Sequence, residues 1–244
     1  MNLINRLGEF GYMCLQVALN IRYAWHDRRR LMEQLDHVGV NSILLVMLVG
    51  FFAGTIIAWQ AAYQFRGMIS LDVLGGQVAR VSVMEMGPVL TALVIAGRIG
   101  ASMTAEIGTM VVTQQVDALR TLALDPVRYL VLPRVLALAI MMPVLTMFAD
   151  VVSIVGAYLV SGYFLDITYQ TFLDSIQMFF EGRDLVGGLL KSCVFGLTIA
   201  FIGCYMGLST SGGAKGVGRA TITSFVLAAV FILVGDFLLW LILF

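Results

Sequence analysis

The chain has 244 residues, of which 60% are hydrophobic and only 12% are charged, whereas soluble domains carry about 25% charged residues. So few charges cannot cover a water-facing surface, which excludes a soluble domain, and a net charge of zero gives no basic footprint for nucleic acid. We therefore predict an all-α membrane protein with about five transmembrane helices, an N-terminal amphipathic interfacial helix and one short cytoplasmic helix.

Residues 1–36 form the first predicted domain, an amphipathic helix followed by a basic segment. Apolar residues recur there at spacings of three and four: Leu3, Leu7, Phe10, Cys14, Val17, Ile21 and Trp25. Polar residues lie largely off this stripe, which favours a helix along the membrane surface, with Arg28, Arg29 and Arg30 beside anionic headgroups. A helix packed on the protein's own bundle is the alternative.

Residues 37–244 form the second predicted domain, a bundle of membrane spans. Five apolar segments are each long enough to cross a bilayer: Val38 to Tyr63, Val81 to Val112, Tyr129 to Phe164, Leu185 to Ser209 and Thr221 to Phe244. Pro88, Pro133 and Pro143 fall in the two longest, where we expect kinks or extensions beyond the lipid. Small residues recur every four positions, as at Gly50 and Gly54, which lets helices approach closely.

The distribution of basic residues predicts the orientation. If the N-terminus is inside, the inner segments hold ten basic residues and the outer ones hold four: Arg66, Arg80, Arg183 and Lys191. This excess predicts a cytoplasmic N-terminus and, for five spans, an external C-terminus.

No cofactor or metal site is expected in this chain. Its three cysteines, Cys14, Cys193 and Cys204, have spacings that match neither a metal site nor a disulfide framework, so we interpret them as packing residues. The segment from Gly207 to Gly212 resembles a phosphate-binding loop, but Gly213 and Ala214 follow where that loop requires a lysine and a hydroxyl residue. The chain therefore has no nucleotide site of its own by this motif, and we predict no enzymatic activity.

Charged residues inside the spans are the first candidates for function, because an ionised group at mid-membrane costs several kcal/mol unless it is paired or hydrated. They are Glu85, Arg98, Glu106, Asp150 and Asp236. Arg98 could pair with Asp150 or Asp236 between helices. A purely structural role for each charge is the alternative.

The segment between the second and third spans predicts a short helix near residues 115–126. Asp117 would cap it, Ala118, Leu119 and Leu122 would form an apolar side, and Asp125 with Pro126 would end it. Arg120 and Arg128 flank the apolar side. Such a helix can dock into the groove of a soluble partner, and an interfacial helix with no partner is the alternative.

Two long runs resemble the MlaE (YrbE) permeases of MCE-type ABC transporters. These runs are EMGPVLTALVIAGRIGASMTAEIGTM, from Glu85 to Met110, and QQVDALRTLALDPVRYLVLPRVLA, from Gln114 to Ala137. The similarity also covers the amphipathic N-terminus and the KSCVFGLTIAFIGCYMG segment from Lys191 to Gly207. It thus extends over nearly the whole chain.

The resemblance implies a homodimeric permease of the bacterial inner membrane that moves phospholipid and supports outer-membrane lipid asymmetry. Its implied partners are a periplasmic MCE-domain protein and two copies of a cytoplasmic ABC ATPase, which would bind the ATP and Mg. The segment Asp117 to Pro126 matches the family's coupling helix, which contacts the ATPase, and Gln60, Tyr63 and Glu85 match positions near the lipid cavity.

Two other functions fit the same composition. An ion-coupled secondary transporter would use Glu85, Glu106, Asp150 or Asp236 and would need no ATPase. A non-transporting membrane scaffold would anchor other subunits.

Overall fold

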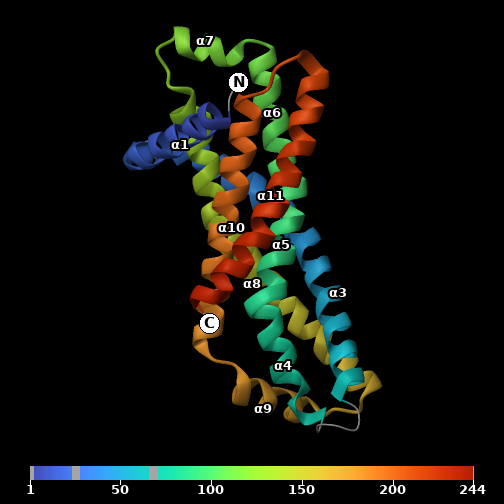
Figure 1. Cartoon of the computed structure of the whole chain (residues 1–244). Coiled ribbons are helices and arrows are strands. Elements are labelled where there is room, and N and C mark those ends of the chain that lie inside the picture. The colour runs from blue at the N-terminus through green and yellow to red at the C-terminus, as the bar shows by residue number, and fades with distance from the viewer. Residues whose placement is uncertain (1–2, 24–27, 66–70, 244) are drawn as a thin grey trace. The chain divides into compact units, whose positions relative to one another are not determined.

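The computed structural model describes residues 3–23, 28–65 and 71–243, and within these ranges the chain is helical and has no strand (Figure 1). Trp25 of the predicted N-terminal stripe and Arg66 of the predicted outer loops lie outside the described residues. The elements are α1 (Leu3–Asn20), η1 (Ile21–Tyr23), α2 (Arg28–Val38), α3 (Val40–Phe65), η2 (Leu71–Val73), α4 (Leu74–Val81), η3 (Ser82–Met86), α5 (Gly87–Ile95), η4 (Ala96–Gly100), α6 (Ala101–Val112), α7 (Gln115–Thr121), η5 (Val127–Val131), α8 (Leu132–Phe164), α9 (Tyr169–Phe179), α10 (Gly182–Leu208) and α11 (Gly213–Leu243).

Among the described residues, five helical stretches are long and apolar enough to cross a membrane, which confirms the predicted number of spans. They are Arg28–Phe65, Leu74–Val112, Val127–Phe164, Gly182–Leu208 and Gly213–Leu243. Each begins before the predicted span, because the apolar run marks only the part that fits the bilayer core and the helix continues into its polar flank. Pro143 lies inside α8, which runs through it without a break in the helix.

The N-terminal helix α1 packs one side on the protein and leaves another side apolar and exposed. The Phe10 ring meets Tyr205 of α10 edge-on at a centroid distance of 5.4 Å, and Met13 and Val17 are buried. Leu15 and Leu19 are more than half exposed. Part of the helix therefore packs on the protein's own bundle, as the alternative interpretation holds, and its place along the membrane surface stays a prediction.

Cys14 on α1 is half-buried, and this burial raises the pKa of its thiol. Less of the thiol is therefore ionised at neutral pH than for an exposed cysteine, so it reacts more slowly with thiol reagents.

One compact unit comprises Met1–Val40, Leu93–Met141 and Val194–Val234. At its centre the buried Thr104 hydroxyl lies 2.9 Å from the Gly100 carbonyl oxygen, 3.1 Å from the Gly203 carbonyl oxygen and 2.9 Å from the Ser224 hydroxyl. Small residues at these positions let α6, α10 and α11 come close enough for one hydroxyl to connect them.

The other unit comprises Asn41–Ala92, Met142–Cys193 and Gly235–Phe244. Its core includes Ala58, Ala62, Leu74, Val78, Ala157, Ile167 and Phe172. Here α9 packs on α4, as Figure 1 shows, and the Ser175 hydroxyl accepts a 2.8 Å hydrogen bond from the Gly76 N–H. The predicted stripe of α3 is confirmed, since a Cβ on Gly54 would overlap the carbonyl oxygen of Ser153 in α8.

Candidate functional site

Three charged side chains, one from each of three membrane-spanning stretches, lie in contact, with Lys191 of α10 between two acids. Its Nζ atom lies 2.9 Å from Glu85 Oε1 and 3.0 Å from Asp236 Oδ1. The Lys191 side chain is fully buried, whereas the side chains of Glu85 and Asp236 are 28% and 19% exposed. A buried ammonium needs such partners, because it has lost the water that would otherwise stabilise its charge. We call these three residues the ion cluster.

The backbone around Glu85 provides a third acceptor for the same cation. Glu85 lies in η3, a widened π-type turn in which the Gly87 N–H bonds back to the Ser82 carbonyl oxygen. Pro88 has no N–H, so it cannot bond the Met84 carbonyl four residues earlier in the α-helical manner. That carbonyl oxygen lies 3.2 Å from Lys191 Nζ. The Met84–Pro88 segment therefore presents both a carbonyl and a carboxylate to Lys191.

Close helix packing fixes the distance between Lys191 and this turn. Gly188 lies three residues before Lys191, on the preceding turn of α10, and a Cβ there would overlap the carbonyl oxygen of Val83. Only glycine lets α10 approach the widened turn so closely. The ammonium group therefore reaches Glu85 and Met84 from the adjacent helix.

The count of basic residues places Lys191 among the outer residues, so the sequence alone misses its role in the ion cluster. Its position offered a signal, because it lies six residues inside the predicted span Leu185 to Ser209, where a lysine needs a partner. Asp236, a possible partner of Arg98 by sequence, instead binds Lys191.

Asp150 of α8 is the most isolated of the predicted charges. Its side chain is buried, and neither carboxylate oxygen has a hydrogen-bond partner among the described residues. One of these oxygens packs against Gly87, where a Cβ would overlap it. Among the described residues, Asp150 therefore makes no hydrogen bond to Arg98, which contradicts the suggested pair between them.

Glu106 and Arg98 lie in the other unit. Glu106 Oε2 accepts a 3.0 Å hydrogen bond from Nη2 of Arg134, whose side chain is 8% exposed, and Arg134 also donates to the Leu130 carbonyl oxygen. Arg98 lies half-buried in η4 and has contacts within the chain. Glu106 is thus part of an ion pair between two spans.

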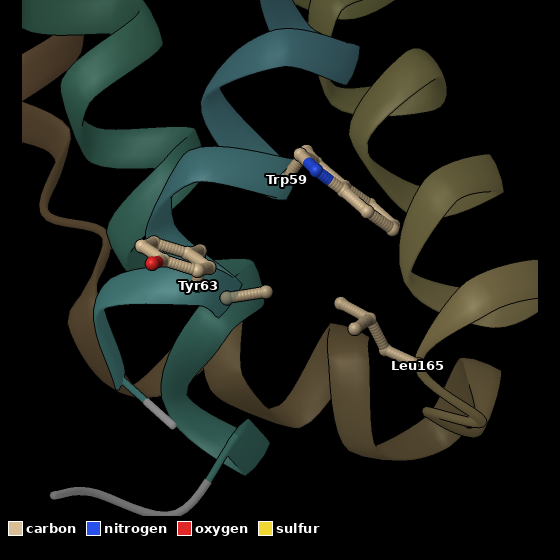
Figure 2. A pocket seen from close by; sticks show the side chains of 4 residues that line it. Trp59, Tyr63 and Leu165 are labelled. Carbon is tan, nitrogen blue, oxygen red and sulfur yellow. The ribbon is translucent and has the colours of Figure 1, made fainter. Parts of the chain in front are cut away.

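The predicted cavity residues Gln60 and Tyr63 lie near the end of α3 and are both exposed. Tyr63 borders a small pocket with Trp59, Ala62 and Leu165, in which Trp59 and Leu165 face one another (Figure 2). The pocket volume is about 50 Å³, far below the ~300–1,000 Å³ of pockets that enclose small molecules. The structure brings Tyr63 to this pocket and Glu85 to the ion cluster, and their place in a lipid cavity stays a prediction.

The short helix after the second span is α7, which covers Gln115–Thr121. Leu122, at its C-terminal end, is 70% exposed, Ala118 is exposed and Leu119 is half-buried. Val116 is buried, so α7 is held to the protein by a residue outside the predicted apolar side. An exposed apolar side on a short helix is the geometry that docking requires.

Two predicted ends of this helix are wrong. Asp117 does not cap α7, because it lies inside the helix and accepts a 3.1 Å hydrogen bond from Arg120. Asp125 and Pro126 begin the next helix: Asp125 Oδ1 accepts a 3.0 Å bond from the Val127 N–H, and proline suits a first helical position.

Comparison with known proteins decides the family. The family model described as Permease MlaE matches residues 31–242. The chain belongs to the MlaE permease family. A probable ABC transporter permease protein of Rickettsia bellii is 42% identical over 97% of this chain and 92% of its own length. A probable ABC transporter permease protein of Synechocystis sp. is 41% identical over 97% of this chain and 90% of its own length.

A plant relative extends the MlaE-family comparison beyond bacteria. The chloroplastic protein TRIGALACTOSYLDIACYLGLYCEROL 1 of Arabidopsis thaliana is 36% identical over 92% of this chain and 64% of its own length. The match to the family model and these relatives confirm the resemblance. This MlaE-family protein is therefore an ABC transporter permease.

Proposed function

We propose that this permease moves phospholipid between the bacterial inner membrane and a periplasmic MCE-domain protein, and so supports outer-membrane lipid asymmetry. It works as a homodimer with a cytoplasmic ABC ATPase, which binds ATP and Mg and hydrolyses the ATP. The N-terminus is cytoplasmic, because the inner segments carry most of the basic residues.

The observation that carries the proposal is the ion cluster, in which three spans contribute a charged side chain. A diacyl lipid needs an apolar space that is open to the bilayer and has a few polar groups for its headgroup. The Glu85 and Asp236 carboxylates are partly exposed while Lys191 is fully buried. The two carboxylates can thus contact a lipid headgroup, while the buried Lys191 ammonium holds them in place. The lipid in the name of the Arabidopsis relative supports the same substrate class.

The exposed surface of α11 supports a homodimer. Only 11% of the most apolar window of this helix is buried within the chain, and Phe231, Phe237 and Trp240 are all exposed. The pocket beside Tyr63 holds about 50 Å³, which is too small for a phospholipid. A cavity shared between two copies would provide the space and would cover part of α11.

The exposed side of α7 supports coupling to an ATPase. Leu122 is 70% exposed on a segment that lies between two spans, so it is free to enter a groove of a soluble subunit. Movement of that subunit would reach the spans through α6 and η5, which flank α7 in the chain.

Reconstitution tests the proposal directly. The permease and its ATPase are placed in donor liposomes that contain fluorescent phospholipid, and transfer to the MCE-domain protein is followed. We expect transfer that requires ATP and stops with a hydrolysis-deficient ATPase. Transfer that follows a proton gradient without the ATPase would show a secondary transporter, and no transfer under any condition would show a scaffold. Either result would overturn the proposal.

A further inference from the structure

Two adjoining cavities lie where the first and third spans begin. The larger has a volume of about 410 Å³ and the smaller about 200 Å³, and Arg30 and Tyr129 line both. Arg30 lies in the first turn of α2, and its Cζ atom is 3.5 Å from the centroid of the Tyr129 ring in η5. This stacking holds the guanidinium group at the boundary of the two cavities.

Three arginines line these cavities from two helical segments. Arg30 and Arg128 border the larger one, and Arg30 and Arg134 border the smaller one. Arg134 is only 6% exposed, and its Nε atom is buried with no hydrogen-bond partner among the described residues. A buried guanidinium with an unused donor is costly unless an acceptor comes close, and this one borders an open cavity.

The acidic residues around the cavities are already engaged with the chain. Asp125 Oδ1 accepts a bond from the Val127 N–H, and Glu33 Oε1 lies 3.2 Å from Arg29 Nε. Glu106 holds Arg134 through Nη2. Arg30 and Arg128 also make contacts within the chain, so a ligand would share them. The cavity linings therefore include three arginines and two carboxylates, those of Asp125 and Glu33. This excess of positive charge favours an anion.

The position of the cavities identifies the kind of anion. Arg30 is in the first turn of the stretch Arg28–Phe65, and Arg128 and Tyr129 are in the first turn of Val127–Phe164. The ends of spans lie at the level of the lipid headgroups, where tyrosine and arginine are enriched. A cavity at that depth meets a lipid phosphate at high local concentration.

We propose that Arg30, Arg128 and Arg134 form a binding site for the phosphate group of an anionic membrane lipid. The phosphate sits beside the stacked Arg30, the polar remainder of the headgroup fills the larger cavity, and the acyl chains stay in the bilayer. The volume of about 410 Å³ falls within the ~300–1,000 Å³ typical of small-molecule pockets. This site is separate from the ion cluster and does not depend on the permease moving lipid.

Binding of phosphatidylglycerol by the purified permease in mixed micelles tests this site. We expect Arg30→Gln and Arg128→Gln each to weaken binding about tenfold, because each loses a charge-assisted contact. Arg219→Gln is the matched control, since it removes the same charge from an exposed arginine that lines neither cavity. Its affinity should change less than about twofold.

Further binding measurements distinguish a lipid phosphate from free phosphate. Phosphatidylcholine should bind more weakly than phosphatidylglycerol, and glycerol phosphate or inorganic phosphate should not displace the lipid. Tyr129→Phe keeps the aromatic face and should bind as the parent does. Equal loss in Arg219→Gln, equal binding of phosphatidylcholine or displacement by free phosphate would each overturn the proposal. If Arg128→Gln does not fold, Arg30→Lys, which keeps the charge and loses the planar stack on Tyr129, gives the same test.

Discussion

Replacing Lys191 with methionine removes the cation of the ion cluster and nearly keeps the volume of its side chain. Breaking a buried ion pair by removing one partner costs about 3–5 kcal/mol. Glu85 and Asp236 are 28% and 19% exposed, so water stabilises part of their stranded charge. We therefore expect a loss near the lower limit, about 3 kcal/mol in the free energy of unfolding. This corresponds to about a hundredfold increase in the ratio of unfolded to folded protein.

Two measurements on the same variants separate stability from transport. In detergent, the Lys191→Met variant should unfold at a lower temperature than the parent. It should also fail to transfer fluorescent phospholipid. Lys215→Met is the control, because Lys215 is exposed and should tolerate the same change.

A neutral triple variant then tests whether the charges have a functional role. Glu85→Gln, Lys191→Met and Asp236→Asn together leave no stranded charge, so stability should recover while transfer stays low. If the triple variant transfers lipid at the parent's rate, the ion cluster is structural only. If Lys191→Met alone matches the parent in both measurements, the argument from burial fails.

Three other changes test separate features. Leu122→Asp should reduce co-purification of the ATPase and abolish ATP-dependent transfer. Gln115→Asp adds the same charge outside the exposed apolar side and should retain both properties. Equal effects of the two changes would exclude α7 as the coupling helix. Gly54→Ala should cost about 1–3 kcal/mol in the free energy of unfolding, because the new methyl meets a backbone carbonyl of α8, whereas Gly218→Ala has open space around it and should be neutral. Arg22→Cys should react with an impermeant maleimide from the cytoplasmic side, above the slow background of the native thiols; reaction only from the periplasmic side would reverse the topology.

The number of spans and the small-residue packing could be predicted from the sequence. An apolar run reports directly how much chain fits the bilayer core, and the spacing of Gly50 and Gly54 reports which face of α3 can approach another helix. Both properties are local, so they do not require knowledge of which helices are neighbours.

The partners in the ion cluster could not be predicted in this way. Lys191 and Asp236 are 45 residues apart, and their pairing depends on which helices lie side by side. Several acids lie in the spans, and one of them, Asp150, has no hydrogen-bond partner within the part of the chain that the structure describes, so composition alone does not assign them. The capping role expected for Asp117 failed for a local reason: an aspartate can cap a helix or bind an arginine one turn later, and here Arg120 is its partner.

The widened turn at Ser82–Met86 has a consequence for movement. A π-type turn contains about one residue more than an α-helical turn. If that extra residue passed to an adjacent turn, the residues in between would rotate by about 100° around the helix axis. Glu85 would then swing away from Lys191 while the helix stayed continuous. The regular α-helical turn that follows, at the start of α5, would then take up the displaced residue. Such a register shift would open and close the ion cluster by rotation alone, without separating the helices that Gly188 holds in close contact.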